Sequence, residues 1–288
     1  MGLYDFSYNY LVKWFCDTTK KNDSEATKVI DTYLEPDDNN IKSINTIMRR
    51  MCISLQNSQY KPNVIKFEKN EERFRAILFD FNPQNILKCY QESEPLLNKF
   101  KEEFNINVKK KTWIDYSIGI IDASKFFSKF KDEKDFFDYA DSYGVGFPYM
   151  LAQRHIKGMK FALACDFLKE IGYTNLVKPD IHMIEITKAL TGKTEDGDCD
   201  DAVCFDILVK TAKKEGVQPY KLDKVLWLIC SGKFYKDKDY NDIIKKNKAA
   251  ESKNNSLREN FITELQKNNI TVDYNIFYDK MPDLHIKS

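Results

Sequence analysis

The stretch from residue 155 to residue 190, HIKGMKFALACDFLKEIGYTNLVKPDIHMIEITKAL, constrains the fold more than any other part of the chain. Its central apolar residues follow the i, i+3, i+4, i+7 spacing of one helix face: Ala164, Phe167, Leu168 and Ile171. Gly172 is a natural end for that helix, and Lys157–Gly158 reads as a tight turn before it. Asp180 follows Pro179 and precedes another apolar run, which is typical of a helix N-cap. The stretch therefore predicts helix, turn, helix, short loop and helix.

The other clearly punctuated segments are helical as well. In QPYKLDKVLWLICSG, Pro219 begins a helix and Gly232 ends it. Residues 1–60 are helical with polar turns, residues 112–150 hold two or three short helices, and the tail after Tyr235 reads as a surface helix plus loop. In ERFRAILFDFNPQNILKCY we expect one helix to end near Phe81 and the next to begin after Pro83. No segment alternates strands with helices, so the predicted fold class is all-α.

Composition limits the size of the core and the kind of partner. The chain has 288 residues, of which 42% are hydrophobic and 14% aromatic, enough for one large domain or two packed lobes. The formal net charge is +1, so a nucleic-acid partner would need a local basic surface. Ten glycines and eight prolines favour helices over a β-sandwich or barrel.

Neither a membrane segment nor a metal-ligand motif is expected. No window approaches eighteen consecutive apolar residues, and the first residues lack the pattern of a signal peptide. The seven cysteines are scattered without a CxxC pair, so zinc and iron–sulfur sites are not predicted. We expect free thiols, a cytoplasmic location and no metal bound through side chains.

Residues 156–186 resemble the helix–hairpin–helix core of the base-excision DNA glycosylase superfamily (HhH-GPD), which includes endonuclease III and the alkylpurine glycosylases. Aligned without a gap, Ile156 takes the first apolar position of the hairpin and Gly158 its first glycine. Met159 takes the position of the valine, and Asp180 takes that of the catalytic aspartate. Two stretches, 161–182 and 219–235, are also similar to a divergent bacterial branch, a likeness that implies no particular activity.

The resemblance implies a two-lobe helical fold with the hairpin near a cleft. Residues 65–175 would form a helical barrel lobe that ends in the hairpin. Residues 1–64 and 176–288 would form the second lobe and a polar tail.

The resemblance also implies roles for individual residues. Asp180 would assist attack of water on the sugar carbon and stabilise an oxocarbenium-like transition state. His182 would orient the helix start. The hairpin would bind a DNA phosphate through its backbone and nearby cations. The implied DNA-binding residues are Ile156, Lys157, Gly158, Met159, Lys160 and Lys178. The local basic surface would comprise Arg154, Lys157, Lys160, Lys169 and Lys178, although these residues could equally form an ordinary solvated face.

Three departures from the family pattern qualify this picture. Lys160 replaces the second hairpin glycine, and a positive φ there would cost about 1 kcal/mol or more. The catalytic lysine of bifunctional members would fall eighteen positions before Asp180, at Ala162, which implies a monofunctional enzyme; Lys160 is close but out of helical phase. No iron–sulfur cysteines follow the core, so the expected cofactors are none, apart from a monovalent cation that the hairpin backbone could hold.

Two further pairs of residues each have two interpretations. Gln84 and Asn85, in FNPQNI, lie about where the endonuclease III type places a glutamine that fills the gap left by the flipped base; an ordinary polar turn explains them too. Trp113 and Tyr116 could line a base pocket, or pack in the core.

The function implied is hydrolysis of the N-glycosidic bond of a damaged or unusual base in double-stranded DNA, by a monomer. A cationic alkylated purine would suit the aromatic content. Two alternatives stay open: a DNA-binding or interaction protein that kept the fold and lost catalysis, and a helical regulatory protein that never contacts DNA. For Asp180, capping and catalysis are compatible, because the family aspartate also lies at a helix start.

Overall fold

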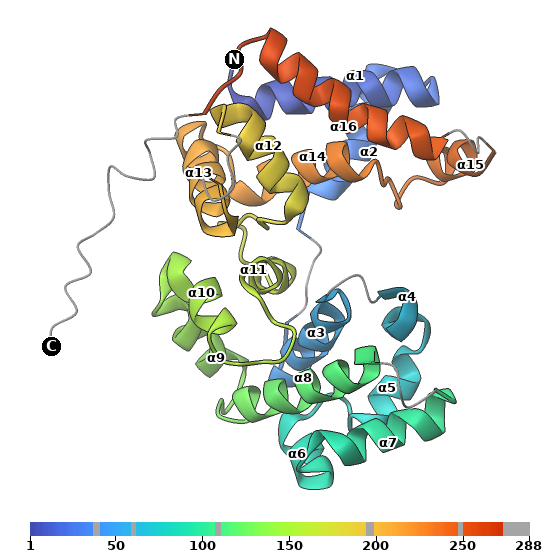
Figure 1. The fold of residues 1–288 in the computed structure, drawn as a ribbon, viewed down its shortest axis with the longest axis vertical. Helices are drawn as coiled ribbons and strands as arrows, with labels where there is room; N and C mark the ends of the chain where they lie inside the picture. Colours follow the sequence, from blue (N-terminus) through green and yellow to red (C-terminus); the bar gives the residue numbers. More distant parts are fainter. Residues whose placement is uncertain (37–40, 59–61, 107–110, 194–198, 247–249, 273–288) are drawn as a thin grey trace, which may run out of the picture. The chain divides into compact units, whose positions relative to one another are not determined.

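The computed structural model describes residues 1–288 except 37–40, 59–61, 107–110, 194–198, 247–249 and 273–288. Every regular element within the described ranges is an α-helix or a short 3₁₀ helix (Figure 1). The prediction of an all-α fold is confirmed. None of the described helices is both long and apolar enough to cross a membrane.

The chain divides into two compact units. Unit 1 combines Met1–Asp37 with Thr174–Ser288, and unit 2 is Asp38–Tyr173. The expected boundary after residue 64 thus differs from the observed one. The reason is α3 (Ile44–Gln56), which packs against α8 (Lys111–Phe127) and α11 (Phe161–Glu170) of unit 2.

Unit 1 is built around one central helix, α14 (Pro219–Ser231). Leu222, Val225, Leu226 and Ile229, which are spaced along one face of α14, are all fully buried. The helices that contact α14 are α1 (Leu3–Thr19), α2 (Asp23–Leu34), α12 (Ile181–Thr191), α13 (Asp201–Lys214) and α16 (Ala250–Lys267). The boundaries predicted at Pro219 and Gly232 are confirmed: Pro219 is the first residue of α14 and Gly232 is its left-handed C-cap.

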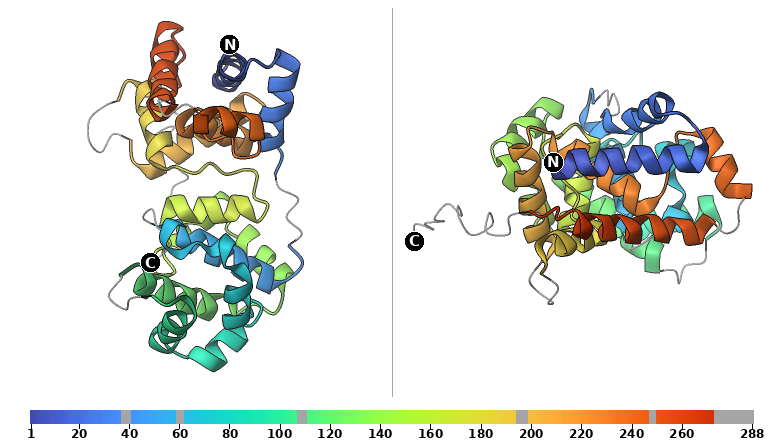
Figure 2. Two further views of the ribbon diagram at one scale, coloured as in Figure 1. Left: turned by 90° about the vertical axis from the view of Figure 1, so that its right-hand side faces the viewer. Right: turned by 90° about the horizontal axis from the view of Figure 1, so that it is seen from above.

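The tail after Tyr235 is more than a surface helix and loop. Residues Leu257, Phe261 and Leu265 of α16 are buried, and α16 lies alongside α1 (Figure 2). The ring of Phe261 lies 5.1 Å from that of Tyr10 and 6.1 Å from that of Phe6. Because α16 is polar on average, its apolar stripe was not recognised in the sequence. The final segment, 273–288, lies outside the described residues.

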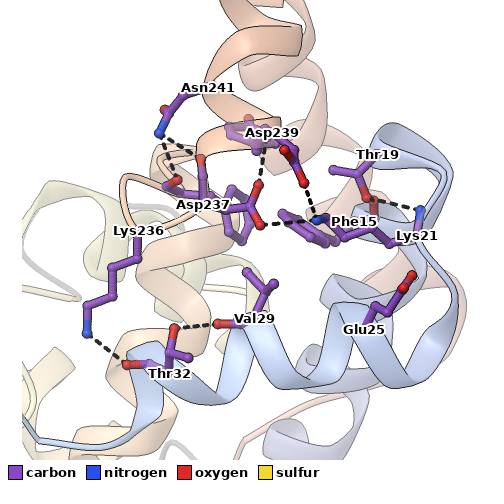
Figure 3. Close-up of polar contacts among 12 residues, drawn as sticks. Phe15, Thr19, Lys21, Glu25, Val29, Thr32, Lys236, Asp237, Asp239 and Asn241 are labelled. Atoms are coloured by element: carbon purple, nitrogen blue, oxygen red, sulfur yellow. Dashed lines mark hydrogen bonds and ion pairs between the residues drawn. The ribbon is translucent and has the colours of Figure 1, made fainter.

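A short helix, α15 (Lys238–Lys246), is fixed to the turn between α1 and α2 by charge (Figure 3). Lys21 Nζ lies 2.8 Å from a carboxylate oxygen of Asp239 and 3.4 Å from one of Asp237. Asp237 also caps the start of α15, because its Oδ1 accepts from the Tyr240 N–H at 2.7 Å. The same carboxylate therefore orders the start of α15 and attaches it to the N-terminal helices.

Unit 2 is organised around α8, which contacts α3, α6 (Pro83–Tyr90) and α7 (Ser93–Phe104). Trp113 and Tyr116 of α8 are 2% and 3% exposed and pack in the core, and Tyr116 also lines part of a pocket beside the hairpin. The remaining elements of the unit are α4 (Pro62–Ile65), η2 (Phe67–Lys69), α5 (Glu71–Ile77), α9 (Glu133–Asp141), η3 (Gly144–Gly146) and α10 (Phe147–Ala152).

The helix expected to end near Phe81 ends earlier. Helix α5 stops at Ile77, and Phe79, Asp80 and Phe81 have φ values of 52°, 53° and 59°. Three successive non-glycine residues in the left-handed region make a turn that apolar spacing does not reveal. Leu78 and Phe81, beyond the end of the helix, are still buried.

Candidate functional site

The predicted hairpin joins α10 to α11 in unit 2. Its two apolar residues, Ile156 and Met159, are 3% and 4% exposed, and the Met159 N–H donates to the Ile156 carbonyl at 2.9 Å. His155 and Gly158 take positive φ values of 58° and 92°. Ile156 and Met159 thus anchor the turn in the core, and only their backbone is left to meet a ligand.

The hairpin rests directly on α8, at a position where α8 has no side chain. A Cβ added to Gly119 would lie 2.6 Å from the Lys157 carbonyl oxygen, closer than any side chain permits. From the next turn of α8, Asp122 Oδ2 accepts from the Lys157 N–H at 3.1 Å. Gly119 and Asp122 together fix the distance between the hairpin and α8 and the orientation of the hairpin.

The substitution of Lys160 for the second hairpin glycine causes no backbone strain. Lys160 has φ −107° and ψ 171°, an extended conformation open to any residue. It is the N-cap residue of α11 and makes no side-chain capping hydrogen bond. The penalty considered for a positive φ does not arise, and the start of α11 keeps the geometry of an anion-binding helix terminus.

In unit 1, Asp180 is the N-cap of α12, as predicted. Its Oδ1 accepts from the His182 N–H at 3.0 Å and from the Met183 N–H at 3.3 Å. The Asp180 N–H donates to the Lys178 carbonyl at 2.8 Å, which closes a tight turn around Pro179. Both hydrogen bonds of the carboxylate end on Oδ1, which leaves Oδ2 as the oxygen that can face a reacting group.

The loop before Asp180 is held by α14. Asp223 Oδ1 accepts from the Lys178 N–H at 2.7 Å, and the Tyr220 N–H donates to the Thr174 carbonyl at 3.0 Å. Asp223 is 3% exposed. A buried carboxylate thus positions the segment that presents Asp180.

Burial raises the pKa of Asp180 above its ordinary value of 3.8. Lys178 and His182 oppose this rise, while the carboxylate of Asp223 adds to it. Burial also raises the pKa of the Cys204 and Cys230 thiols, to which the charge of Asp180 contributes. Asp180 therefore lies among buried, weakly polar groups, an environment in which a carboxylate interacts strongly with any nearby positive charge.

The side chain of His182 is in contact with a residue of α16. Its Nδ1 lies 3.5 Å from Arg258 Nη1, and the same nitrogen of Arg258 forms an ion pair of 2.8 Å with Glu185. Arg258 thus orients His182 at the start of α12, which fits the structural role expected for this histidine.

Asp223 and Arg258 are the two residues of this site that the sequence did not reveal. Helix α14 is buried on nearly every face, so an acid in its middle had to have a buried partner, and this signal could have pointed to Asp223. Arg258 comes from a polar helix far along the chain, and no local pattern links it to His182.

The remaining predicted residues are distributed as follows. Lys157 and Lys160 are exposed on the hairpin, and Gln84 and Asn85 are exposed in the first turn of α6, where Asn82 caps the Asn85 N–H at 2.9 Å. Ala162 lies in the first turn of α11. Lys169 is 3% exposed, so it does not contribute to an exposed basic surface.

No metal site is visible in the described ranges, where no three His, Cys, Asp or Glu side chains gather as metal ligands. None of the seven cysteines forms a disulfide.

The fold defines the class of protein to which the chain is similar. The helices of the chain, including the hairpin between α10 and α11, have the helix–hairpin–helix glycosylase fold. One solved structure that matches is the crystal structure of Methanocaldococcus jannaschii 8-oxoguanine glycosylase/lyase in complex with a 15mer DNA containing 8-oxoguanine. The TM-score is 0.50 at 18% identity, over 78% of this chain and 98% of the archaeal chain. At this identity the likeness shows the fold alone. No protein-family model and no curated protein sequence matches the chain.

Proposed function

We propose that the protein is a DNA glycosylase-like hydrolase that cleaves the N-glycosidic bond of a damaged or unusual base in double-stranded DNA. The observation that carries this proposal is Asp180, a partly buried carboxylate at the N-terminus of α12, at the family spacing from the hairpin. The fold match to a glycosylase/lyase in complex with lesion-containing DNA supports the same class. We propose further that the protein acts as a monomer in the cytoplasm.

The proposed role of Asp180 is electrostatic. As the bond from the sugar carbon to the base nitrogen breaks, positive charge develops on the sugar, and the ionised carboxylate stabilises it. Water then forms the new bond to the sugar carbon, and its proton leaves to the departing base or to solvent. The amides of His182 and Met183 fix Oδ1, so Oδ2 is the oxygen that would face the sugar or the water.

Residues that we propose to contact DNA occur in each unit. In unit 2, the backbone of residues 156–160 and the cations of Lys157 and Lys160 would contact phosphates. Gln84 and Asn85 would fill the space left by the flipped base. In unit 1, Lys178 would contribute positive charge next to Asp180. Because the backbone of Lys160 is extended, its replacement of the second hairpin glycine places no strain on the hairpin.

We propose a monofunctional reaction because Ala162 occupies the position of the lyase lysine. Borohydride treatment during turnover tests this point, because it traps a Schiff base between an enzyme amine and the sugar. No trapped adduct is expected. A trapped adduct lost in Lys160→Ala would assign lyase chemistry to Lys160.

A monovalent cation at the hairpin carbonyls is implied by the resemblance. The Ile156 carbonyl already accepts from Met159, and the Lys157 carbonyl packs against α8, so no proposed step depends on a cation. Duplex binding compared in potassium and in tetramethylammonium at equal ionic strength tests whether one is bound.

The deciding experiment is single-turnover base release from a panel of duplexes containing 8-oxoguanine, alkylated purines or other lesions. Asn is as good an N-cap as Asp, so Asp180→Asn removes the charge and keeps the helix start. We expect release of at least one base by the wild type and a loss of at least about a hundredfold in the variant.

Binding measurements cover the outcome in which no base is released. Equal binding of an abasic-analogue duplex by wild type and variant, with steep salt dependence, would identify a DNA-binding relative without catalysis. Absence of binding even at low salt would contradict any function on DNA and would leave a helical regulatory protein.

A further inference from the structure

Beside the hairpin, unit 2 contains a pocket of about 170 Å³. It lies between the end of α3, the first turns of α8 and the hairpin. The residues that line it are Leu55, Ser58, Ile65, Lys111, Thr112, Asp115, Tyr116, Lys157, Gly158 and Lys160.

The pocket carries more positive charge than its surroundings neutralise. Three lysines line it, against one carboxylate, that of Asp115, which lies 3.8 Å from Lys157 Nζ. Within the described part of the chain, no ion pair is formed by Lys111 or by Lys160. A concave surface with two uncompensated lysines favours an anionic ligand.

Two of these lysines lie at helix N-termini, where the helix dipole disfavours a positive charge. Lys111 is the first residue of α8 and Lys160 is the N-cap of α11, and neither helix has an acid in its first turn. Helices α2 and α9, by contrast, begin with acids: α2 with Asp23 and Glu25, and α9 with Glu133 and Asp135. A cation at a helix N-terminus costs stability, so a role in binding an anion explains its placement better than folding does.

The size of the pocket limits the ligand. With about 30 Å³ per water, it holds roughly five or six waters, and it is well below the roughly 300–1,000 Å³ of sites for drug-sized ligands. The hydroxyls of Ser58 and Thr112 add hydrogen-bond donors to the lysines. This combination suits a phosphate group, with the rest of a nucleotide left outside the pocket.

We propose that this pocket is a phosphate subsite, separate from the backbone amides of the hairpin. It shares Lys157, Gly158 and Lys160 with the hairpin, so a backbone phosphate of bound DNA is the expected source, and this part rests on the proposed function. A free phosphate has the same chemistry and is the second source that the test distinguishes.

The test compares three forms of the full chain. Lys111→Gln removes one pocket charge, and Lys125→Gln is its matched control, because Lys125 is an exposed lysine at the other end of α8, about 21 Å away along the helix. Inorganic phosphate, titrated against chloride at equal ionic strength, is expected to raise the Tm of the wild type and of Lys125→Gln, with a clearly smaller effect on Lys111→Gln. For duplex binding, the slope of log K against log salt should fall by about 0.9 in Lys111→Gln alone.

The two readouts separate the sources. Loss of both effects in Lys111→Gln assigns the pocket to a DNA phosphate, and loss of the phosphate effect alone assigns it to a free phosphate. Identical behaviour of Lys111→Gln and Lys125→Gln in both readouts overturns the proposal. Neither readout uses base release, so the subsite can be established even if the proposed glycosylase activity fails.

A charge-reversal variant distinguishes a loss of binding from a loss of folding. In Lys111→Glu an acid replaces a cation at the start of α8, so the Tm without phosphate should rise while binding of phosphate and duplex falls. A fall in Tm together with weaker binding would indicate a structural role for Lys111 and would contradict the subsite.

Discussion

The surroundings of Asp180 act on its pKa in two opposite directions. Its cap hydrogen bonds favour the ionised carboxylate, but burial and Asp223 raise its pKa above 3.8. Because the folded state holds this proton more tightly than the unfolded state, stability is lost as pH rises from about 3.8 through the raised pKa. We expect Asp180→Asn to have a higher Tm than the wild type at neutral pH, with the gap closing in acid. Thermal melts of both proteins across this range provide the check, and a gap that widens in acid would contradict it.

Asp223 should contribute to the pH dependence of the reaction, because its charge adds to the rise that burial causes in the pKa of Asp180. Asn can keep the hydrogen bond from the Lys178 N–H but lacks the charge that raises the pKa of Asp180. In Asp223→Asn the acid limb of the pH–rate profile for base release should therefore move to lower pH. Asp223→Ala, which also loses the hydrogen bond, should show the same shift with a lower plateau rate. An unmoved acid limb in both variants would mean that Asp223 acts only through position.

The sequence identified some of these residues and not others, for a physical reason. Asp180 was predictable because its cap hydrogen bonds and its spacing from the hairpin are local features. Asp223 and Arg258 reach the site through packing of α14 and α16 onto α12, which no local pattern encodes. The Lys160 backbone is the reverse case: the residue was noticed, but only the structure gives its φ.

At the scale of elements, the contact between the hairpin and α8 is the most sensitive to substitution. Ala usually stabilises a helix relative to Gly by roughly 0.5–1 kcal/mol. Gly119→Ala should do the opposite and cost about 1–3 kcal/mol, because its Cβ would meet the Lys157 carbonyl at 2.6 Å. Denaturant unfolding and duplex affinity should both show the loss.

Gly146→Ala is the matched control, since its added Cβ meets no atom within 4 Å. It should be neutral or slightly stabilising. Equal effects of the two substitutions would argue against the close approach of hairpin and helix.

Element boundaries were predictable where the chain carries explicit punctuation. Gly172, Asp180, Pro219 and Gly232 all mark helix ends that the structure has, because each residue type fits one backbone conformation well. The turn at residues 79–81 was not predictable, since its left-handed backbone is imposed on Phe and Asp by their surroundings.

At the scale of the molecule, α16 contributes to the core of unit 1 although its sequence is mostly polar. Phe261 is fully buried against Phe6 and Tyr10 of α1. Phe261→Ala should cost about 3–5 kcal/mol, as deletion of a core aromatic does. Glu259→Ala, on the exposed face of the same helix, should stay within about 0.5 kcal/mol. Urea unfolding of the two variants tests whether α16 belongs to the core of unit 1, and a small loss for Phe261→Ala would contradict it.

The division of the chain has a consequence for how the protein is made. Unit 1 takes its helices from both ends of the sequence, while unit 2 is continuous. During translation α1 and α2 leave the ribosome before unit 2, yet α14, on which they pack, is synthesised only after all of unit 2. Unit 2 can complete its core while the chain is still growing, but the apolar faces of α1 and α2 stay uncovered until the C-terminal helices arrive. The nascent protein therefore passes through a period in which one unit is finished and the other exposes a surface that chaperones bind.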